Sequence, residues 1–326
     1  MVSLLDSLEV KGFMFKNRLV MPPMQTSLAT RDGAVTDKLI EYYVQRSKAL
    51  GLLILEHSYV SLDGKSSEKQ LGIYDDKLID GLEKLTSRVH AQEIPIIIQI
   101  NHAGRKASKD VTGFQPVAPS TTENARELQV EELERLADVY ASAAQRAMKA
   151  GFDGVEVHGA HGFLLNQFYS PLANNRIDKY GGSLENRVRF PLEVIKKVKE
   201  TIGRRLLLYR LGSVDLDSEG TQITDSKQFA NKLEGVGVDI IDISGGFCGS
   251  RPAQLQGTQG YFIPQAQQIK GVVSIPVIGV GGIIDLEYAD KVIREGMVDL
   301  VAVGRKLRND PEWVSNAIKK LVTGPS

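Results

Sequence analysis

Two histidines stand directly after an apolar run that ends at Val157. They belong to the segment His158-Gly159-Ala160-His161, so the imidazoles are three residues apart and could converge on one point. Imidazoles in that arrangement can donate to an oxyanion, bind a metal ion or exchange protons with a substrate. A catalytic zinc site usually has a third protein ligand, and the candidates belong to other strands without ligand-like spacing: His57, His102 and Glu56. The pattern therefore favours work on a bound substrate over a metal site, with a structural role as the alternative.

Two glycine-containing turns near the end of the chain could bind phosphate. Gly281 and Gly282 follow one short apolar run, and Gly304 and Arg305 follow the next. Glycine lets backbone N–H groups approach phosphate oxygens closely, and arginine adds a charge-assisted hydrogen bond. The alternative is that these glycines only permit tight turns. Because both turns carry glycine and one also carries arginine, the sequence favours phosphate binding.

Two polar residues interrupt otherwise apolar runs. Gln99 stands among isoleucines, and Arg210 follows three leucines and a tyrosine. A buried amide or guanidinium costs several kcal/mol unless it has a partner. Arg210 could pair with Glu56 or Asp242, as buried arginines usually pair with a carboxylate. Together with the phosphate turns, the two residues predict a bound cofactor with a long polar and aromatic body, whose identity these residues alone leave open.

Short apolar runs alternate with amphipathic stretches along the chain. The runs are uniformly apolar, which is typical of strands buried on both faces of a parallel sheet. We predict strands at Arg18–Met21, Leu52–Glu56, Ile96–Ile100, Gly154–Val157, Leu206–Leu211, Ile240–Ile243, Val277–Ile278 and Leu300–Val303. We predict helices at Lys38–Leu50, Lys77–Ala91, Val130–Ala150, Glu185–Glu200, Asp225–Glu234, Ile263–Ile269, Leu286–Arg294 and Pro311–Leu321. Eight such alternations favour an α/β chain folded as a (β/α)₈ TIM barrel, in a single domain covering residues 1–326.

Three further segments can be placed relative to this barrel. Leu8–Lys16, with Gly12 between short apolar stretches, predicts an N-terminal hairpin that plugs one end. Asn101–Arg126 and Ala160–Ser183 are long loops after the third and fourth strands. Loops of that length are more often functional than idle, and they follow the carboxyl ends of strands, where barrel chemistry is found.

Composition excludes several classes of protein. The chain has 326 residues, 40 Lys and Arg against 40 Asp and Glu, and one cysteine, Cys248. A single thiol cannot form an internal disulfide, and zero formal net charge argues against general binding to nucleic acid or an anionic membrane. No apolar stretch is long enough to span a membrane, and Met1–Leu8 lacks the pattern of a signal peptide. We therefore expect a cytoplasmic protein.

Several stretches resemble the Old Yellow Enzyme family of FMN-dependent NADH:flavin oxidoreductases, or ene-reductases. They are Asn17–Met24, Gln99–Arg105 and Gly154–Gly162, and then the most specific one, Asn166–Leu172, followed by Arg176, Asp178, Tyr180–Ser183 and Glu185–Arg187. The resemblance covers nearly the whole chain and implies a (β/α)₈ barrel with FMN at its carboxyl-end mouth. The length implies the single-domain form, without the iron–sulfur domain of longer relatives, and one cysteine could not hold a cluster.

The resemblance also implies a role for each candidate residue. The residues that would contact FMN are Pro22, Pro23, Met24, Gln25, His57, Gln99, Arg210, Gly281, Gly282, Gly304 and Arg305. Among them, Gln99 would bond the pyrimidine edge of the flavin, and Arg210 would lie near N1 and O2. His158 and His161 would hold the carbonyl oxygen of an electron-poor alkene while hydride from flavin N5 reaches the β-carbon. NADPH or NADH would reduce the flavin.

One departure from the family pattern concerns the proton. Two residues after His161, where the family commonly has a tyrosine that protonates the α-carbon, this chain has Phe163. A phenyl ring has no proton to give, and general acid help is typically worth about 10²–10⁴-fold. Water or Tyr261 could substitute, with Cys248 as a weaker candidate. We therefore expect reduction of activated alkenes, with a flavin-dependent isomerase or a flavin-binding protein of little turnover as alternatives.

Smaller departures affect the flavin potential and the assembly. Gln25 stands where relatives often have threonine or cysteine, and His57 is bulkier than the small residue often found there. The tail Ala317–Ser326 has no arginine, so a dimer that shares its active sites through such a residue is not indicated. The sequence leaves open the physiological substrate, the choice between NADH and NADPH, and whether the chain forms a homo-oligomer.

Overall fold

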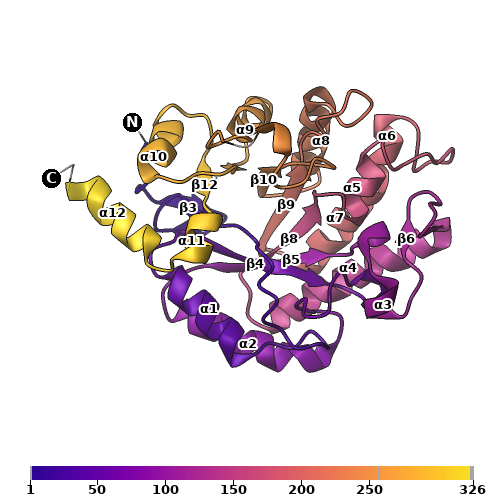
Figure 1. The fold of residues 1–326 in the computed structure, drawn as a ribbon, viewed down its shortest axis with the longest axis horizontal. Coiled ribbons are helices and arrows are strands. Elements are labelled where there is room, and N and C mark those ends of the chain that lie inside the picture. Colours follow the sequence, from indigo (N-terminus) through magenta and orange to yellow (C-terminus); the bar gives the residue numbers. More distant parts are fainter. Residues whose placement is uncertain (1, 256, 324–326) are drawn as a thin grey trace.

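The computed structural model describes residues 2–255 and 257–323, and its centre is a closed barrel of parallel strands. Strands that follow one another in the sequence are neighbours in the barrel, and the last pairs with the first through Val301 and Leu19. The barrel strands are β3 (Leu19–Met21), β4 (Leu52–Tyr59), β5 (Ile96–Asn101), β8 (Gly154–Gly159), β9 (Leu206–Gly212), β10 (Ile240–Ser244), β11 (Val277–Gly279) and β12 (Leu300–Ala302). This arrangement confirms the predicted (β/α)₈ fold (Figure 1).

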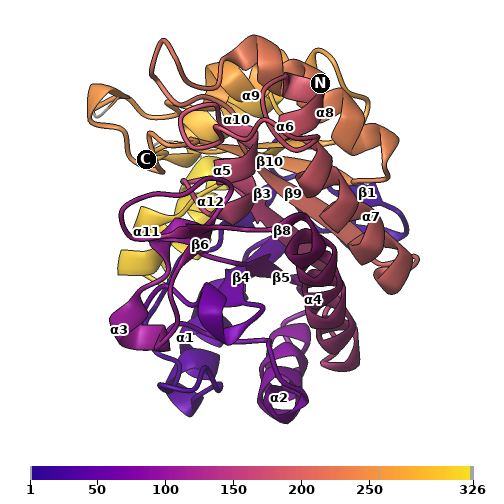
Figure 2. The same ribbon diagram turned by 90° about the vertical axis from the view of Figure 1, so that its right-hand side faces the viewer.

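Amphipathic helices surround the barrel (Figures 1 and 2). The longer ones are α1 (Asp37–Ser47), α2 (Ile79–His90), α4 (Val130–Lys149), α7 (Arg189–Ile202), α8 (Ile223–Gly235), α9 (Ile263–Lys270), α10 (Leu286–Arg294) and α12 (Trp313–Thr323). Helix α4 shows why they form: Gln129 and Glu132 make a capping box at its start. Its buried residues Leu133, Leu136 and Tyr140 then recur at helical spacing and face the strands.

Several predicted helix boundaries were wrong, among them the end of the first helix, which lies at Ser47 and not at Leu50. The predicted helix Glu185–Glu200 is two helices, α6 (Leu184–Arg187) and α7, because Pro191 lacks an N–H and is tolerated only in the first turn of a new helix. Helix α8 begins at Ile223 rather than Asp225, since Gln222 is its extended N-cap residue. Helix α12 begins at Trp313, two residues after Pro311. The predicted tail ends with residues 324–326, which lie outside the described part of the chain.

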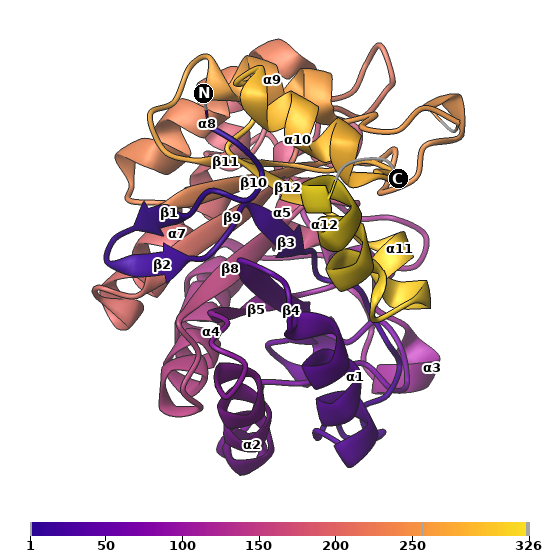
Figure 3. The same ribbon diagram turned by 90° about the vertical axis from the view of Figure 1, so that its left-hand side faces the viewer.

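The N-terminal hairpin closes the amino-terminal end of the barrel, as predicted. Strands β1 (Leu8–Val10) and β2 (Phe13–Phe15) pair in antiparallel fashion (Figure 3). Val10 and Phe15 belong to one apolar cluster with side chains from inside the barrel: Val20, Leu52, Ile54, Ile97, Leu206, Leu208, Ile240, Ile278, Leu300 and Ala302. We call this cluster the lower barrel core. It fills the lower part of the barrel with aliphatic side chains.

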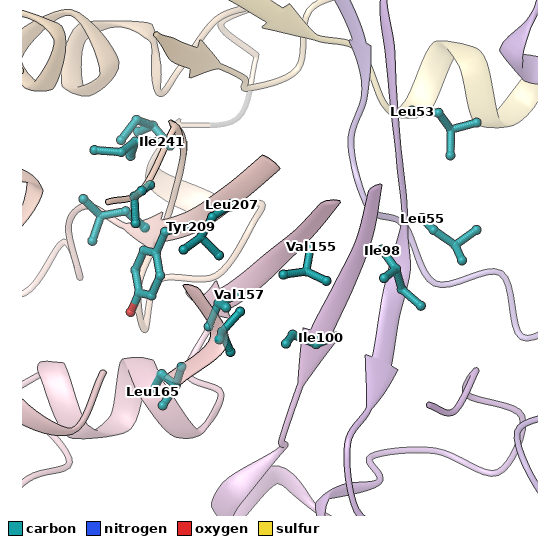
Figure 4. Close-up of a cluster of buried hydrophobic side chains, with 14 of the residues drawn as sticks. Leu53, Leu55, Ile98, Ile100, Val155, Val157, Leu165, Leu207, Tyr209 and Ile241 are labelled. Carbon is teal, nitrogen blue, oxygen red and sulfur yellow. The ribbon is translucent and has the colours of Figure 1, made fainter. Parts of the chain in front are cut away.

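The alternate residues of the same strands form a second core between the strands and the helices. Figure 4 shows part of it, with side chains such as Ile98, Val155, Leu207 and Ile241. Successive side chains of a strand point to opposite faces, so one face of each strand packs on the helices while the other enters the barrel. This explains why the strands read as continuous apolar runs.

The two long loops contain structure of their own. After β5 come a short 3₁₀ helix at Gly104–Lys106, α3 (Lys109–Thr112) and β6 (Val117–Ala118), which pairs with β7 (Arg126–Glu127). After β8 comes α5 (Leu164–Tyr169). Gln167 of α5 ties the loops together, because its Nε2 donates to the carbonyl oxygens of Ala103 at 3.1 Å and Gly162 at 2.8 Å. Across the described residues, no helix is long and apolar enough to cross a membrane.

Candidate active site at the barrel mouth

A cavity of about 540 Å³ opens at the carboxyl ends of the barrel strands. It brings together most of the predicted site residues: Pro22, Pro23, Met24, Gln25, His57, Gln99, His158, His161, Arg210, Tyr261, Gly282, Gly304 and Arg305. Its wall also includes Phe163, Ser250, Arg251, Val280, Ile283, Ala302 and Arg308. Gly281 is the predicted residue that does not line the cavity. Glycine at this position instead permits a close approach of two backbone segments, since a Cβ there would lie 2.8 Å from the backbone nitrogens of Tyr261 and Phe262.

The two predicted histidines meet at this cavity. The ring centroids of His158 and His161 are 5.1 Å apart, with the ring planes nearly perpendicular. His158 is 2% exposed. Burial is the main cause that lowers both pKa values well below the usual histidine range, and neighbouring positive groups add to it. At neutral pH both imidazoles are therefore uncharged, and each carries one N–H.

The loop that carries His161 is tightly fixed. His161 has a φ of 58°, in the left-handed region that is unusual for a residue with a Cβ. Its N–H donates to the carbonyl oxygen of Gly245 at 3.1 Å, and Lys106 Nζ donates to its carbonyl oxygen. Asn166 Oδ1 accepts a hydrogen bond from the N–H of Gly162 at 2.7 Å. These contacts give a structural reason for the Asn166-Gln167 motif: it holds the histidine loop.

Phe163 stands against the histidines. Its ring centroid lies 5.0 Å from that of His158 and 5.3 Å from that of His57. Lys106 Nζ lies 5.4 Å from the centre of the same ring. Phe163 is the N-cap residue of α5, so its position is set by the start of that helix. The cavity thus has an aromatic wall without a hydroxyl at this point.

His57 is held in one orientation by amides. Its Nδ1 lies 3.0 Å from Gln70 Nε2, which is a donor, so Nδ1 accepts and the proton is on Nε2. That Nε2 lies 3.3 Å from Gln25 Oε1. Burial lowers the pKa of His57 to about 4, with the Arg210 charge as a smaller cause. His57 is therefore a neutral residue that orients Gln25 beside the cavity.

A buried polar layer lies inside the barrel beneath the cavity. Gln99 Nε2 donates to Glu156 Oε2 at 2.6 Å, and Arg210 Nη1 lies 3.3 Å from Asp242 Oδ2. The predicted alternative partner of Arg210, Glu56, instead accepts hydrogen bonds from Thr26. Both Glu156 and Asp242 are fully buried, and burial raises both pKa values, that of Asp242 to about 6. Sequence reasoning missed Glu156, although a charged residue in the middle of an apolar strand was a usable signal.

The far turns form a cationic end of the cavity. A Cβ on Gly282 would lie 2.7 Å from Arg305 Nη2 and 2.8 Å from Cε1 of Tyr261, and one on Gly304 would lie 3.0 Å from Met24 Sδ. Arg308, which was not predicted from the sequence, follows Arg305 at helical spacing in α11 (Arg305–Asn309) and so faces the same cavity. Tyr261 lies at this end, and its hydroxyl donates to the carbonyl oxygen of Ser250 at 2.8 Å.

These residues fit FMN. Nearby side chains leave no room for a Cβ on Gly282. A glycine at this turn therefore leaves the backbone accessible to a ligand beside Arg305. Buried polar atoms without a hydrogen-bond partner in the described chain lie at or directly below the cavity, among them His158 Nδ1, Arg210 Nε and Asp242 Oδ1. Buried polar groups normally have partners, so these atoms indicate a polar ligand. Within the described residues, no group of three His, Cys, Asp or Glu could hold a metal ion.

Comparison with known proteins gives the same assignment. Residues 3–323 match the NADH:flavin oxidoreductase / NADH oxidase family. The chain is 44% identical over 321 residues to an NADH oxidase of Thermoanaerobacter brockii, covering 94% of this chain but only about half (49%) of that protein. It is 39% identical over 319 residues to an NADPH dehydrogenase of Bacillus licheniformis, covering 96% of this chain and 93% of that protein.

Solved structures are similar over nearly the whole length. An old yellow enzyme homologue from Zymomonas mobilis aligns with a TM-score of 0.87 and 30% identity, covering 98% of this chain and 93% of that one. Morphinone reductase in complex with tetrahydroNAD aligns with a TM-score of 0.85 and 28% identity, covering 100% of this chain and 92% of that one.

Proposed function

We propose that this chain reduces the C=C bond of electron-poor alkenes such as enones and enals. It belongs to the NADH:flavin oxidoreductase / NADH oxidase family, that is, to the FMN-dependent NAD(P)H oxidoreductases of the Old Yellow Enzyme type. The observation that carries this proposal is the pair of uncharged imidazoles, His158 and His161, in the same cavity as Gln99, Arg210 and Arg305.

FMN, when bound, supplies the hydride carrier between NAD(P)H and the alkene. Arg305 and the turns at Gly282 and Gly304 would hold its phosphate, as helix starts and arginine do for phosphates in general. Gln99 and Arg210 would bind the pyrimidine edge. Because Glu156 engages Gln99 Nε2, the amide presents its oxygen as an acceptor toward the cavity. Arg210 would supply positive charge there.

His158 and His161 act on the alkene. Each donates one N–H to the carbonyl oxygen of the substrate, which withdraws electron density from the conjugated double bond and makes the β-carbon more electrophilic. Donors of this kind are worth about 10²–10³-fold each in other enzymes. Neutral imidazoles suit this role, because a neutral ring can donate without carrying a charge whose desolvation would weaken the site. The same residues fix the position of the substrate.

The proton for the α-carbon comes from solvent in this proposal. Phe163 has no proton to give, and the hydroxyl of Tyr261 already donates to Ser250 beside Gly282 and Arg305. Tyr261 remains the alternative donor, since it lines the cavity. A carbanion next to a carbonyl is readily protonated by water, so the loss of the tyrosine slows this step without preventing it.

Phe163 also motivates a second candidate function. Without an efficient donor, hydride could return from the substrate after rotation about the former double bond, which gives isomerisation with no net consumption of NAD(P)H. A third possibility is a flavin-binding protein with little turnover. Both share the cofactor site and differ from the main proposal only in the fate of the alkene.

Anaerobic turnover separates these functions. We expect FMN-loaded protein to consume NADPH or NADH when 2-cyclohexenone is added, with cyclohexanone as the product. Isomerisation of a cis alkene without consumption of reductant would replace the main proposal with the second. Reduced enzyme that no alkene of a broad panel reoxidises would contradict the main proposal, and if it also isomerises none of them, only the third possibility is left.

A further inference from the structure

The imidazole of His161 has a partner behind the cavity. His161 Nε2 lies 2.7 Å from the hydroxyl oxygen of Ser244, the last residue of β10. Ser244 is 1% exposed. Ser244 could not be predicted from the sequence, because a serine at a strand end carries no chemical signal of its own.

Only one direction of this hydrogen bond satisfies both groups. In the part of the chain that the structure describes, the Ser244 hydroxyl makes one hydrogen bond, to His161. If it accepted from Nε2–H, its own proton would be buried without an acceptor, which is unfavourable. If it donates to Nε2, the contact satisfies both groups. We propose that Ser244 fixes His161 as the Nδ1–H tautomer and so makes it a hydrogen-bond donor toward the cavity. This inference deepens the proposed function and rests on it.

The backbone makes the contact possible. The loop after β8 passes over β9 to reach β10, and Gly212 lies at the crossing point. A Cβ on Gly212 would lie 3.2 Å from Cα of Ala160 and 2.8 Å from Cα of Gly246. His161 itself is anchored by its N–H to the carbonyl oxygen of Gly245, the residue after Ser244. The imidazole is thus held next to the hydroxyl by backbone contacts as well as by the side-chain bond.

His158 has no comparable hydrogen-bond partner for its Nδ1 in the described chain, so the two histidines are not equivalent. Its Nδ1 is buried and has no hydrogen-bond partner within the described residues. Its ring is placed by packing against Phe163 and His161. Ser244 is therefore a positioning residue for one of the two donors, and its loss should affect His161 alone.

The test uses FMN-loaded protein labelled with ¹⁵N-histidine. The chain has five histidines, so the His161 signals can be assigned with one variant, His161→Ala. Nitrogen chemical shifts distinguish a protonated from an unprotonated ring nitrogen. We expect wild-type His161 to carry its proton on Nδ1, and Ser244→Ala to give a mixture of tautomers or the Nε2–H form. We also expect Ser244→Ala to weaken binding of p-chlorophenol, a mimic of the substrate oxygen, about tenfold.

Ser213→Ala is the matched control. Ser213 is equally buried and its hydroxyl donates to the Ser244 carbonyl oxygen at 2.9 Å, away from the imidazole. It should leave both the tautomer and phenol affinity within about twofold of wild type. A wild-type His161 protonated on Nε2, or a Ser244→Ala variant with unchanged tautomer and affinity, would overturn the inference. Wild-type protein with the expected tautomer but no phenol affinity would instead contradict the proposed function.

Discussion

The two ends of the barrel interior are built on the same strands and have opposite character. On β9, Leu206 and Leu208 belong to the lower barrel core, and the next inward residue, Arg210, lines the cavity. On β10, Ile240 lies in that core, and Asp242 lies above it. The lower end is aliphatic and closed by the hairpin, whereas the upper end buries acids, an amide and a guanidinium.

Along one strand, the residues at the lower end contribute mainly to stability, and those at the upper end contribute mainly to function. Aliphatic side chains in the lower barrel core stabilise the fold through burial. The polar layer above contributes little, because desolvating charges costs about as much as pairing them returns, and several of its atoms lack a partner in the described chain. The layer is explained by what binds above it. Substitutions in the lower barrel core should therefore lower the free energy of unfolding, whereas substitutions at the upper end should lower catalytic activity and change the free energy of unfolding little.

The largest effect is expected from the double variant His158→Ala, His161→Ala. It removes both donors to the substrate oxygen, so kcat/KM for 2-cyclohexenone should fall at least about 10³-fold. Thermal unfolding should change little, because two neutral side chains are removed from a cavity wall. Stopped-flow mixing of reduced enzyme with the alkene measures the effect. A large fall in the unfolding temperature of this variant would instead mean that the side chains at the upper end stabilise the fold.

Phe15→Ala tests the lower end of the barrel, where we expect a loss of stability without a change at the cofactor site. Phe15 is fully buried in the lower barrel core, so its removal should cost about 3–5 kcal/mol in the free energy of unfolding. Bound FMN should keep its absorbance spectrum, since the hairpin lies at the other end of the barrel. Urea unfolding gives the first quantity and spectroscopy the second. Met14→Ala is the control, because Met14 is 53% exposed in the same strand. It should change the free energy of unfolding by less than about 1 kcal/mol.

Phe163→Tyr sharpens the comparison at the upper end alone. A hydroxyl beside His158 would supply the missing general acid, so reoxidation of the reduced enzyme by an alkene should accelerate about 10²-fold if protonation is limiting. Phe247→Tyr, which adds a hydroxyl on a residue outside the cavity lining, is the control and should have no effect. An unchanged rate in Phe163→Tyr would show that the proton already comes efficiently from another source, either water or Tyr261.

The smallest effect is expected from Glu156→Gln and depends on pH. Burial raises the pKa values of Glu156 and Asp242, so the folded chain keeps a proton that the unfolded chain has already lost. Stability therefore falls as the pH rises from about 4 through about 6, the Asp242 value, and beyond. Glu156→Gln should flatten this dependence, because the amide cannot bind or release a proton in this pH range. Parallel pH profiles for wild type and variant would contradict a raised pKa of Glu156.

The sequence predicted the barrel, the plug and most of the cavity wall, for identifiable reasons. Strand residues such as Gln99 and Arg210 stand out chemically against an apolar run, and the register of parallel strands then brings them to one end. Ser244, Arg308 and the backbone role of Gly281 were not predictable in this way. They depend on where a loop crosses a strand or how a short helix is turned, which is set by tertiary packing. The helix starts at Ile223 and Trp313 were missed because more than one nearby residue could cap each helix.

We propose that FMN lies at the upper end of the barrel with the two imidazoles beside its reactive face. The most direct test is an anaerobic absorbance titration of FMN-loaded protein with p-chlorophenol. We predict a long-wavelength charge-transfer band in wild type that is lost in the His158→Ala, His161→Ala variant, while the flavin absorbance of that variant remains. Protein that does not bind FMN, or a band of equal strength in the variant, would contradict the account.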